Sequence, residues 1–164
     1  MTTVRLTITL DATQQNVYAM AGDADTPMVF PPAYQCATPF GADIGGANPA
    51  FFAIANNAAL GFAEFDSWLT VGFTDGSAPG AISASPGFDL STWTDSAGIS
   101  QENGAIFFME PGTMEANSGA GPIVMAQMTV SAETVAGGGT ATAELQGRSA
   151  GGADDWTLPV SWTW

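Results

Sequence analysis

The chain has 164 residues, with no histidine, no lysine, one cysteine (Cys36) and two arginines (Arg5 and Arg148), against sixteen acidic residues. Without an imidazole there is no base for a Ser-His-Asp or Cys-His nucleophile, and the usual zinc ligands are missing, so we expect a protein that is not an enzyme. The formal charge of −14 repels phosphates, which excludes nucleic acid as a partner, and the length suits a single domain over residues 1–164.

The N-terminal third reads as strands followed by a loop. Residues 1–10 alternate polar and apolar side chains, which predicts a strand and not a signal peptide. Residues 16–21 and 28–30 predict two further short strands, and the proline- and glycine-rich residues 33–49 predict a long loop. Nowhere does an apolar run reach the eighteen or so residues of a membrane span, so we expect no membrane insertion.

The middle of the chain mixes apolar segments with polar loops. Residues 50–55 predict a compact apolar strand and residues 65–73 the strongest central strand, with a turn between them. Residues 76–104 are rich in Gly, Ser, Asp and Pro and predict a loop, after which residues 105–109 predict a strand.

The last third predicts three evenly spaced strands, at residues 123–130, 140–146 and 157–164, separated by glycine-rich turns. Pro159 cannot donate to a strand ladder, so the final strand is expected to lie at an edge, or to meet its neighbour through a bulge at Pro159. Its alternation is expected to turn one set of side chains inward, namely Leu158, Val160, Trp162 and Trp164.

Eight to ten strands joined by irregular loops predict an all-β fold, an antiparallel β-sandwich. Two segments near the C-terminus, residues 121–130 and 140–145, flank the glycine turn at residues 137–139. This order resembles the C-terminal hairpin of cohesin-like jelly-roll sandwiches. The resemblance implies a jelly-roll-like fold and carries no partner with it.

Four other segments, taken together, resemble a β-domain of algal proteins that include the pyrenoid shell proteins: residues 16–22, 65–72, 103–109 and 146–152. The resemblance implies a non-enzymatic unit that assembles laterally into protein sheets, located at the chloroplast pyrenoid. An extracellular matrix or surface suits the same composition, so the compartment stays open.

Carboxylate pairs are the remaining route to catalysis, because two of them suffice for glycoside hydrolysis without histidine. Glu64 and Asp66 are the nearest candidates, since residues i and i+2 of a strand share a face. Solvated surface charge explains these two residues equally well, and we expect no catalytic residues.

Two acidic clusters raise the question of calcium, which prefers oxygen ligands. They are Asp23 with Asp25, and Asp154 with Asp155, and neither follows the Asp-x-Asp-x-Asp-Gly order of ligands. We expect ordinary turns at both places, with a structural calcium ion as the alternative and no other cofactor.

The tryptophans suggest where a partner would dock. Trp68 and Trp162 lie in alternating strands and are expected in the core, whereas Trp93 and Trp156 lie in or beside polar loops and are expected to be exposed. Exposed indoles serve either as a sugar-stacking platform or as anchors of a protein interface.

For Arg148 and Cys36 the sequence predicts ordinary structural roles. Arg148 precedes Asp154 and Asp155 by six and seven positions, so an ion pair that fastens its loop is expected, with an intermolecular ion pair as the alternative. Cys36 has no partner for an intramolecular disulfide and is expected to be buried.

These observations favour a structural protein that self-associates into a homo-oligomer or lattice, as one unit of a sheet, shell or matrix. The alternative is a carbohydrate- or protein-binding β-sandwich module, with or without bound calcium. Exposed apolar or aromatic area on two or more patches favours assembly, and a single groove lined by Trp, Asn and Asp favours the binding of a sugar or a peptide.

Overall fold

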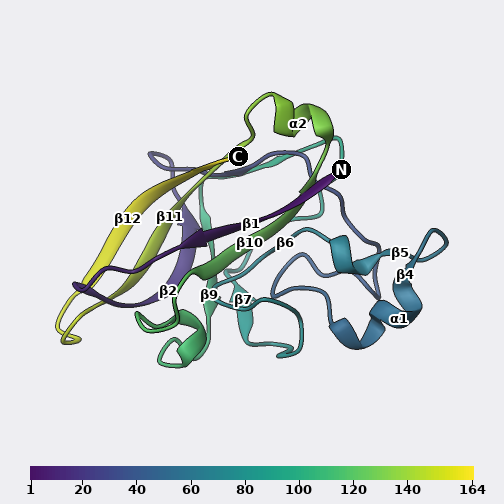
Figure 1. The fold of residues 1–164 in the computed structure, drawn as a ribbon. Coiled ribbons are helices and arrows are strands. Elements are labelled where there is room, and N and C mark those ends of the chain that lie inside the picture. The colour runs from purple at the N-terminus through teal and green to yellow at the C-terminus, as the bar shows by residue number, and fades with distance from the viewer.

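The computed structural model describes residues 1–164, apart from the side chain of Met114. The described residues form twelve strands and a few short helical segments (Figure 1). The strands are β1 (Thr2–Ile8), β2 (Gln14–Gly22), β3 (Met28–Phe30), β4 (Asn56–Asn57), β5 (Gly61–Phe62), β6 (Trp68–Leu69), β7 (Ile82–Ala84), β8 (Ile99–Gln101), β9 (Gly104–Phe108), β10 (Ile123–Val130), β11 (Thr140–Ser149) and β12 (Asp155–Thr163). The helical segments are α1 (Phe52–Ala55), α2 (Ala132–Ala136) and the 3₁₀ turns η1 (Pro49–Phe51), η2 (Ala63–Phe65) and η3 (Met114–Ala116).

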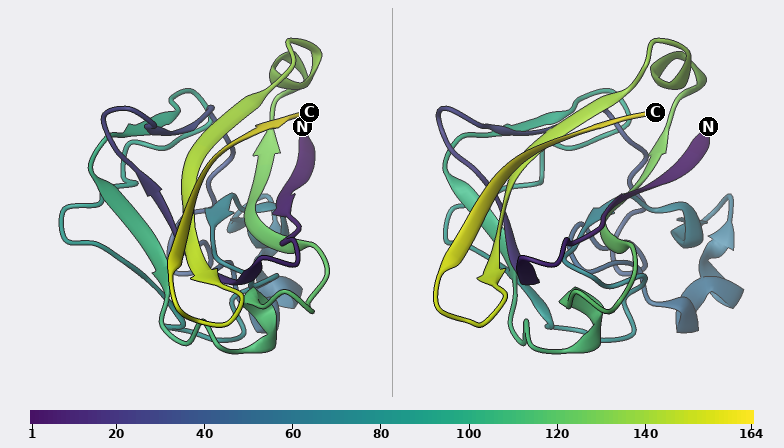
Figure 2. Two further views of the ribbon diagram at one scale, coloured as in Figure 1. Left: turned by 90° about the vertical axis from the view of Figure 1, so that its left-hand side faces the viewer. Right: turned by 60° about the vertical axis from the view of Figure 1, so that its left-hand side comes forward.

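The strands build two main sheets that pack together. One sheet has the order β1-β10-β6, and the other has the order β7-β9-β2-β11-β3-β8, with β12 added beside β11. All ladders between these strands are antiparallel. The predicted all-β, antiparallel sandwich is therefore confirmed, and Figure 2 shows the two chain ends at the same end of it, near α2.

The main core fills the space between the sheets. Leu6 and Leu69 come from the smaller sheet, and Met20, Phe30 and Leu145 from the larger one, all at most 4% exposed. A second, small cluster lies beside the sandwich and consists of Cys36, Ala47, Ala55 and Ala63. The predicted burial of Cys36 is confirmed.

Several strand predictions agree closely with the structure. Residues 28–30 and 123–130 are β3 and β10, and residues 16–21 lie within β2. Among the described strands β12 pairs with β11 alone, so it is an edge strand as Pro159 predicted. Its inward face is incomplete, because Leu158 is 46% exposed while the other three predicted side chains pack on the core.

The strand predicted at residues 50–55 is wrong, because this segment forms η1 followed by α1. Pro49 stands at the start of η1, where its missing N–H costs nothing, and the Asn48 side chain accepts a hydrogen bond from the N–H of Ala50. Capping and an alanine-rich sequence therefore outweigh the apolar character of this segment. Together with β4 and β5 it lies to one side of the sandwich (Figure 1).

The long central strand predicted at residues 65–73 is also wrong. Only Trp68–Leu69 forms a strand, β6, at the end of the three-stranded sheet, with β10 at its centre. Hydrogen bonds from Thr70 and Gly72 to β10 continue the pairing irregularly, and Gly72 has a φ of +94° that ends it. The apolar pattern identified contact with the core but not the length of the strand.

Two further predictions fail because of topology. The strands at residues 121–130 and 140–145 do not form a hairpin, since β10 and β11 belong to different sheets and α2 lies between them. Residues 76–104 are not wholly loop, because β7 and β8 pair there with β9 and β3. Both strands are three residues long, too short to show an alternation in sequence.

Candidate functional site

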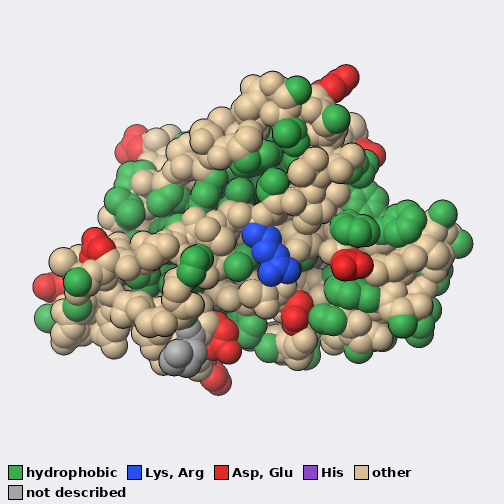
Figure 3. Space-filling model, viewed as in Figure 1, with side chains coloured by type: hydrophobic (Ala, Val, Ile, Leu, Met, Phe, Trp, Pro, Cys, Tyr) green, Lys and Arg blue, Asp and Glu red, His purple; other side chains and the backbone are tan. Residues whose placement is uncertain are grey.

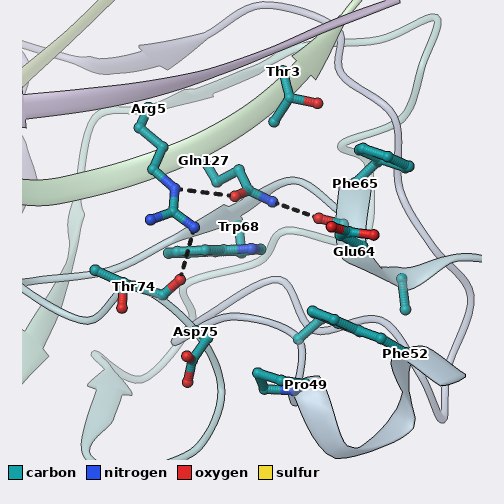
Figure 4. Close-up of a pocket in the computed structure, with 12 residues that line it drawn as sticks. Thr3, Arg5, Pro49, Phe52, Glu64, Phe65, Trp68, Thr74, Asp75 and Gln127 are labelled. Atoms are coloured by element: carbon teal, nitrogen blue, oxygen red, sulfur yellow. Dashed lines mark hydrogen bonds between the residues drawn. The ribbon is translucent and has the colours of Figure 1, made fainter. Parts of the chain in front are cut away.

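A pocket of about 320 Å³ opens on the outer side of the three-stranded sheet (Figure 4). Arg5 reaches it from β1, Gln127 from β10 and Trp68 from β6. Glu64 in η2 and Asp75 in the loop after β6 line it as well. The site thus combines a cation, two carboxylates, an amide and an aromatic ring from separate parts of the chain.

Hydrogen bonds hold the polar wall in place. Gln127 is 5% exposed, and its Nε2 donates to the carbonyl oxygens of Glu64 and Asp66 at 3.1 and 2.9 Å. Arg5 Nε donates to Gln127 Oε1 at 3.3 Å, and Arg5 Nη2 donates to the carbonyl oxygen of Thr74 at 3.0 Å. These contacts leave three of the five N–H groups of Arg5 without a partner among the described residues.

Apolar side chains form the opposite wall. In Figure 4 the rings of Phe52 and Phe65 lie across the pocket from Arg5, with Pro49 below them. Trp68 is only 2% exposed and lies at the base of the pocket. The pocket therefore presents hydrogen-bonding groups on one side and aromatic carbon on the other.

An exposed apolar surface borders this pocket. Eight large hydrophobic side chains are exposed among those that the structure describes, and five of them belong to residues 51–65. We call these five the apolar face: Phe51, Ile54, Leu60, Phe62 and Phe65. Hydrophobic side chains gather over α1, β4 and β5 in Figure 3. Beside the apolar face, Met1, Tyr34, Phe62 and Phe65 line an apolar hollow of about 440 Å³.

The acidic pair Glu64 and Asp66 does not form. Asp66 is fully buried, and its two carboxylate oxygens accept hydrogen bonds from the N–H groups of Cys36 and Ala42, both at 2.7 Å. Glu64 is exposed and accepts from the side chain of Asn56 at 2.9 Å. The 3₁₀ turn η2 replaces the strand that the i, i+2 argument required.

Asp66 fastens the long loop of residues 33–49 to the start of β6. Burial raises the pKa of this carboxyl to about 6, although hydrogen bonds from the N–H groups of Cys36, Ala42 and Ser67 lower it. The nearby Asp43 carboxyl adds a smaller upward shift to the pKa.

The predicted calcium residues have turn roles. Asp23 Oδ1 accepts hydrogen bonds from the N–H groups of Asp25 and Thr26 at 2.8 and 2.6 Å, which closes an Asx turn. Asp155 pairs with Arg148, and Asp154 accepts from the N–H of Ser149 through its backbone. The described residues contain no group of three or more metal-ligating side chains in a suitable arrangement.

Arg148 lies directly opposite Asp155 across the β11–β12 ladder, and its Nε is 3.3 Å from Asp155 Oδ1. The predicted ion pair within the loop is therefore present. Both side chains are about half exposed, so the pair stabilises the fold little.

The exposure predicted for Trp93 is wrong. Trp93 is 2% exposed, packs at a ring distance of 5.9 Å from Phe30, and donates from Nε1 to the carbonyl oxygen of Pro31. Trp156 is half-buried, and its Nε1 donates to the carbonyl oxygens of Asn16 and Arg148. Polar neighbours in the sequence misled the prediction, because each indole N–H finds a backbone oxygen inside the fold.

The sequence prediction missed both Arg5 and the apolar face. Arg5 was visible only as one of two cations in the chain. The apolar face has a clearer signal, because residues 44–63 contain no charged side chain in a protein with sixteen acidic residues.

No helix of the described structure is long and apolar enough to cross a membrane. Comparison with known protein families, with characterised proteins and with solved structures finds no match to this chain.

Proposed function

We propose that this protein is a non-enzymatic β-sandwich unit that associates with copies of itself through the apolar face, as part of a protein sheet, shell or matrix. The observation that carries the proposal is the apolar face itself, whose side chains are 40–60% exposed. Exposed apolar side chains gathered on one segment mark an interaction surface, because leaving them in water is unfavourable by about 25 cal/mol per Å² of apolar area.

Charge restricts where two copies of this protein can touch. Two molecules that each carry −14 repel one another, so a stable contact between copies requires a surface where carboxylates are few. Residues 44–63 carry no charge, and Glu64 is the one carboxylate within residues 51–65, the segment that holds the apolar face. The hollow lined by Phe62 and Phe65 lies next to protruding hydrophobic side chains, as in a surface that is complementary to itself.

A sheet or shell needs a second contact on each unit. The outer edges of β1 and β12 have no strand partner among the described residues, although the Thr7 carbonyl of β1 accepts a hydrogen bond from the Trp162 side chain. The unpaired backbone groups of an edge strand are a template for pairing with another strand. β1 carries a single charged residue, Arg5, so its edge adds little repulsion. Edge pairing is the second contact in this proposal.

The test compares two matched variants. Ile54→Asp and Met109→Asp each replace an exposed hydrophobic side chain, 60% and 58% exposed, with a carboxylate, but Met109 lies outside the apolar face. We expect light scattering to show the wild type and Met109→Asp as oligomers at physiological salt, and Ile54→Asp at the monomer mass of 16.7 kDa. Electron microscopy of the wild type then shows whether the oligomers are ordered sheets.

Two results contradict the proposal. One is a wild-type protein that stays monomeric at all salt and protein concentrations. The other is an Ile54→Asp variant that associates as the wild type does, which would place the contact elsewhere. Circular dichroism of each variant checks that the fold is intact.

A further inference from the structure

The Arg5 pocket holds three charged side chains that are not paired with one another. Arg5, Glu64 and Asp75 all line it, yet within the described residues the only ion pair is the one between Arg148 and Asp155. In Figure 4 these groups border the pocket from different sides. Their charges are presented to the space between them and not to each other.

Each of these side chains retains hydrogen-bonding capacity. Glu64 uses one carboxylate oxygen, Oε2, to accept from Asn56, and Asp75 uses Oδ1 to accept from the N–H of Ser77. Arg5 keeps both N–H groups of Nη1 and one of Nη2. A ligand in the pocket therefore meets open donors and open acceptors together.

The charges of Arg5, Glu64 and Asp75 limit the kinds of ligand that the pocket can bind. Two carboxylates disfavour an anion, and the guanidinium disfavours a metal cation. A hydroxyl group both donates and accepts, so a neutral polyol satisfies the carboxylates and the guanidinium at once. It also approaches a protein of charge −14 without repulsion.

The opposite wall of the pocket supplies apolar surface for a ligand to pack on. Phe52 is half-buried and Phe65 is 44% exposed, so both rings offer carbon surface toward the pocket. The C–H face of a sugar ring is apolar and packs on such surface. A volume of about 320 Å³ lies at the lower end of the range of small-ligand pockets and suits one sugar unit.

We propose that the Arg5 pocket binds a single neutral hexopyranose unit of a glycan. Glu64 and Asp75 accept hydrogen bonds from its hydroxyls, Arg5 donates to its oxygens, and Phe65 packs on its C–H face. The buried Gln127 holds Arg5 in place before the ligand arrives, which lowers the entropy cost of binding. Phe65 also belongs to the apolar face, so this site borders the proposed contact between copies and shares one side chain with it.

The experiment uses the full chain and a panel of methyl α- and β-hexopyranosides of glucose, galactose and mannose. We expect ligand-observed NMR and calorimetry to show saturable binding of at least one of them, at millimolar concentration. Asp75→Asn and Arg5→Gln each remove a group that contacts the ligand, and each should weaken binding about tenfold or more. Arg148→Gln removes the same charge outside the pocket and should leave the affinity unchanged.

Arg5→Gln also loses the hydrogen bonds to Gln127 and Thr74, so its unfolding midpoint is measured beside its affinity. Asp75→Asn keeps an oxygen for Ser77 and therefore tests the pocket even if Arg5→Gln is unstable. Absence of binding to every glycoside overturns the proposal. Binding that survives Asp75→Asn and Arg5→Gln, or binding of free amino acids in place of glycosides, overturns it too.

Discussion

The buried carboxyl of Asp66 joins a loop to the sheet and makes the stability of the protein depend on pH. Its pKa in the folded protein, about 6, lies above the ordinary value of 3.8, so the folded state binds the proton more tightly than the unfolded state does. The contribution of Asp66 to stability therefore increases as the pH falls through 6 and decreases as the pH rises above it. At neutral pH the buried charge is a cost that the N–H groups of Cys36 and Ala42 offset in part.

We predict that lowering the pH from 7 to 5 raises the free energy of unfolding by about 1 kcal/mol through Asp66 alone. Asp66→Asn removes this titration, so the difference between the two pH values should shrink by that amount in urea unfolding. Asp89→Asn is the control, because hydrogen bonds with Ser91 lower the pKa of Asp89 and it stays ionised over this range. An unchanged pH dependence in Asp66→Asn would contradict the assignment.

A side-chain hydrogen bond joins β1 and β12, which belong to different sheets. Trp162 on β12 donates from Nε1 to the carbonyl oxygen of Thr7 on β1 at 2.9 Å, across the open side of the sandwich. Trp164, two residues later and also half-buried against the core, has an indole N–H with no hydrogen-bond partner. Two tryptophans that lie two residues apart near the end of the chain therefore differ: the indole N–H of Trp162 makes a hydrogen bond to the other sheet, and that of Trp164 makes none among the described residues.

This difference gives a matched pair of variants. Trp162→Phe should lower the free energy of unfolding by about 1 kcal/mol, because it removes a hydrogen bond between the sheets as well as some apolar area. Trp164→Phe removes a buried donor that has no acceptor, so we expect a smaller loss or a gain. Urea unfolding measures both, and a larger loss for Trp164→Phe would show that ring packing and not the hydrogen bond decides stability here.

At the scale of the whole molecule, negative charge is the dominant property. Fourteen excess charges are distributed over a fold in which one ion pair is formed among the described residues. Repulsion between them destabilises the compact state, and salt screens it, since the Debye length falls from about 30 Å at 0.01 M to about 8 Å at 0.15 M. The same screening lowers the barrier to contact between two copies.

We predict that the unfolding midpoint of the Ile54→Asp monomer rises with sodium chloride between 0.01 and 0.15 M. For a chain of this length, each 1 kcal/mol gained corresponds to about 2–4 °C. Using this variant separates repulsion within one molecule from association between molecules. A midpoint that is independent of salt would show that the acidic side chains lie too far apart to repel one another.

The fold class, the burial of Cys36 and the edge position of β12 could all be predicted from the sequence. These follow from local rules: alternation places β3 and β10 correctly, and Pro159 removes a backbone donor wherever it lies. The local pattern failed at residues 50–55 and 65–73. A cap at Asn48 starts a helical turn in the first segment, the positive φ of Gly72 ends the pairing in the second, and hydrophobic periodicity shows neither.

Which side chains come into contact depends on how the two sheets pack, and the sequence does not show it. The Arg5 pocket joins β1, η2, the loop after β6, and β10, so no spacing along the chain predicts it. Trp93 is buried for the same reason, since its acceptor, the Pro31 carbonyl, lies 62 residues away. Hydrophobic periodicity reflects only residues that are close in the sequence. A site is formed by segments that are far apart in the sequence and come into contact only when the two sheets pack.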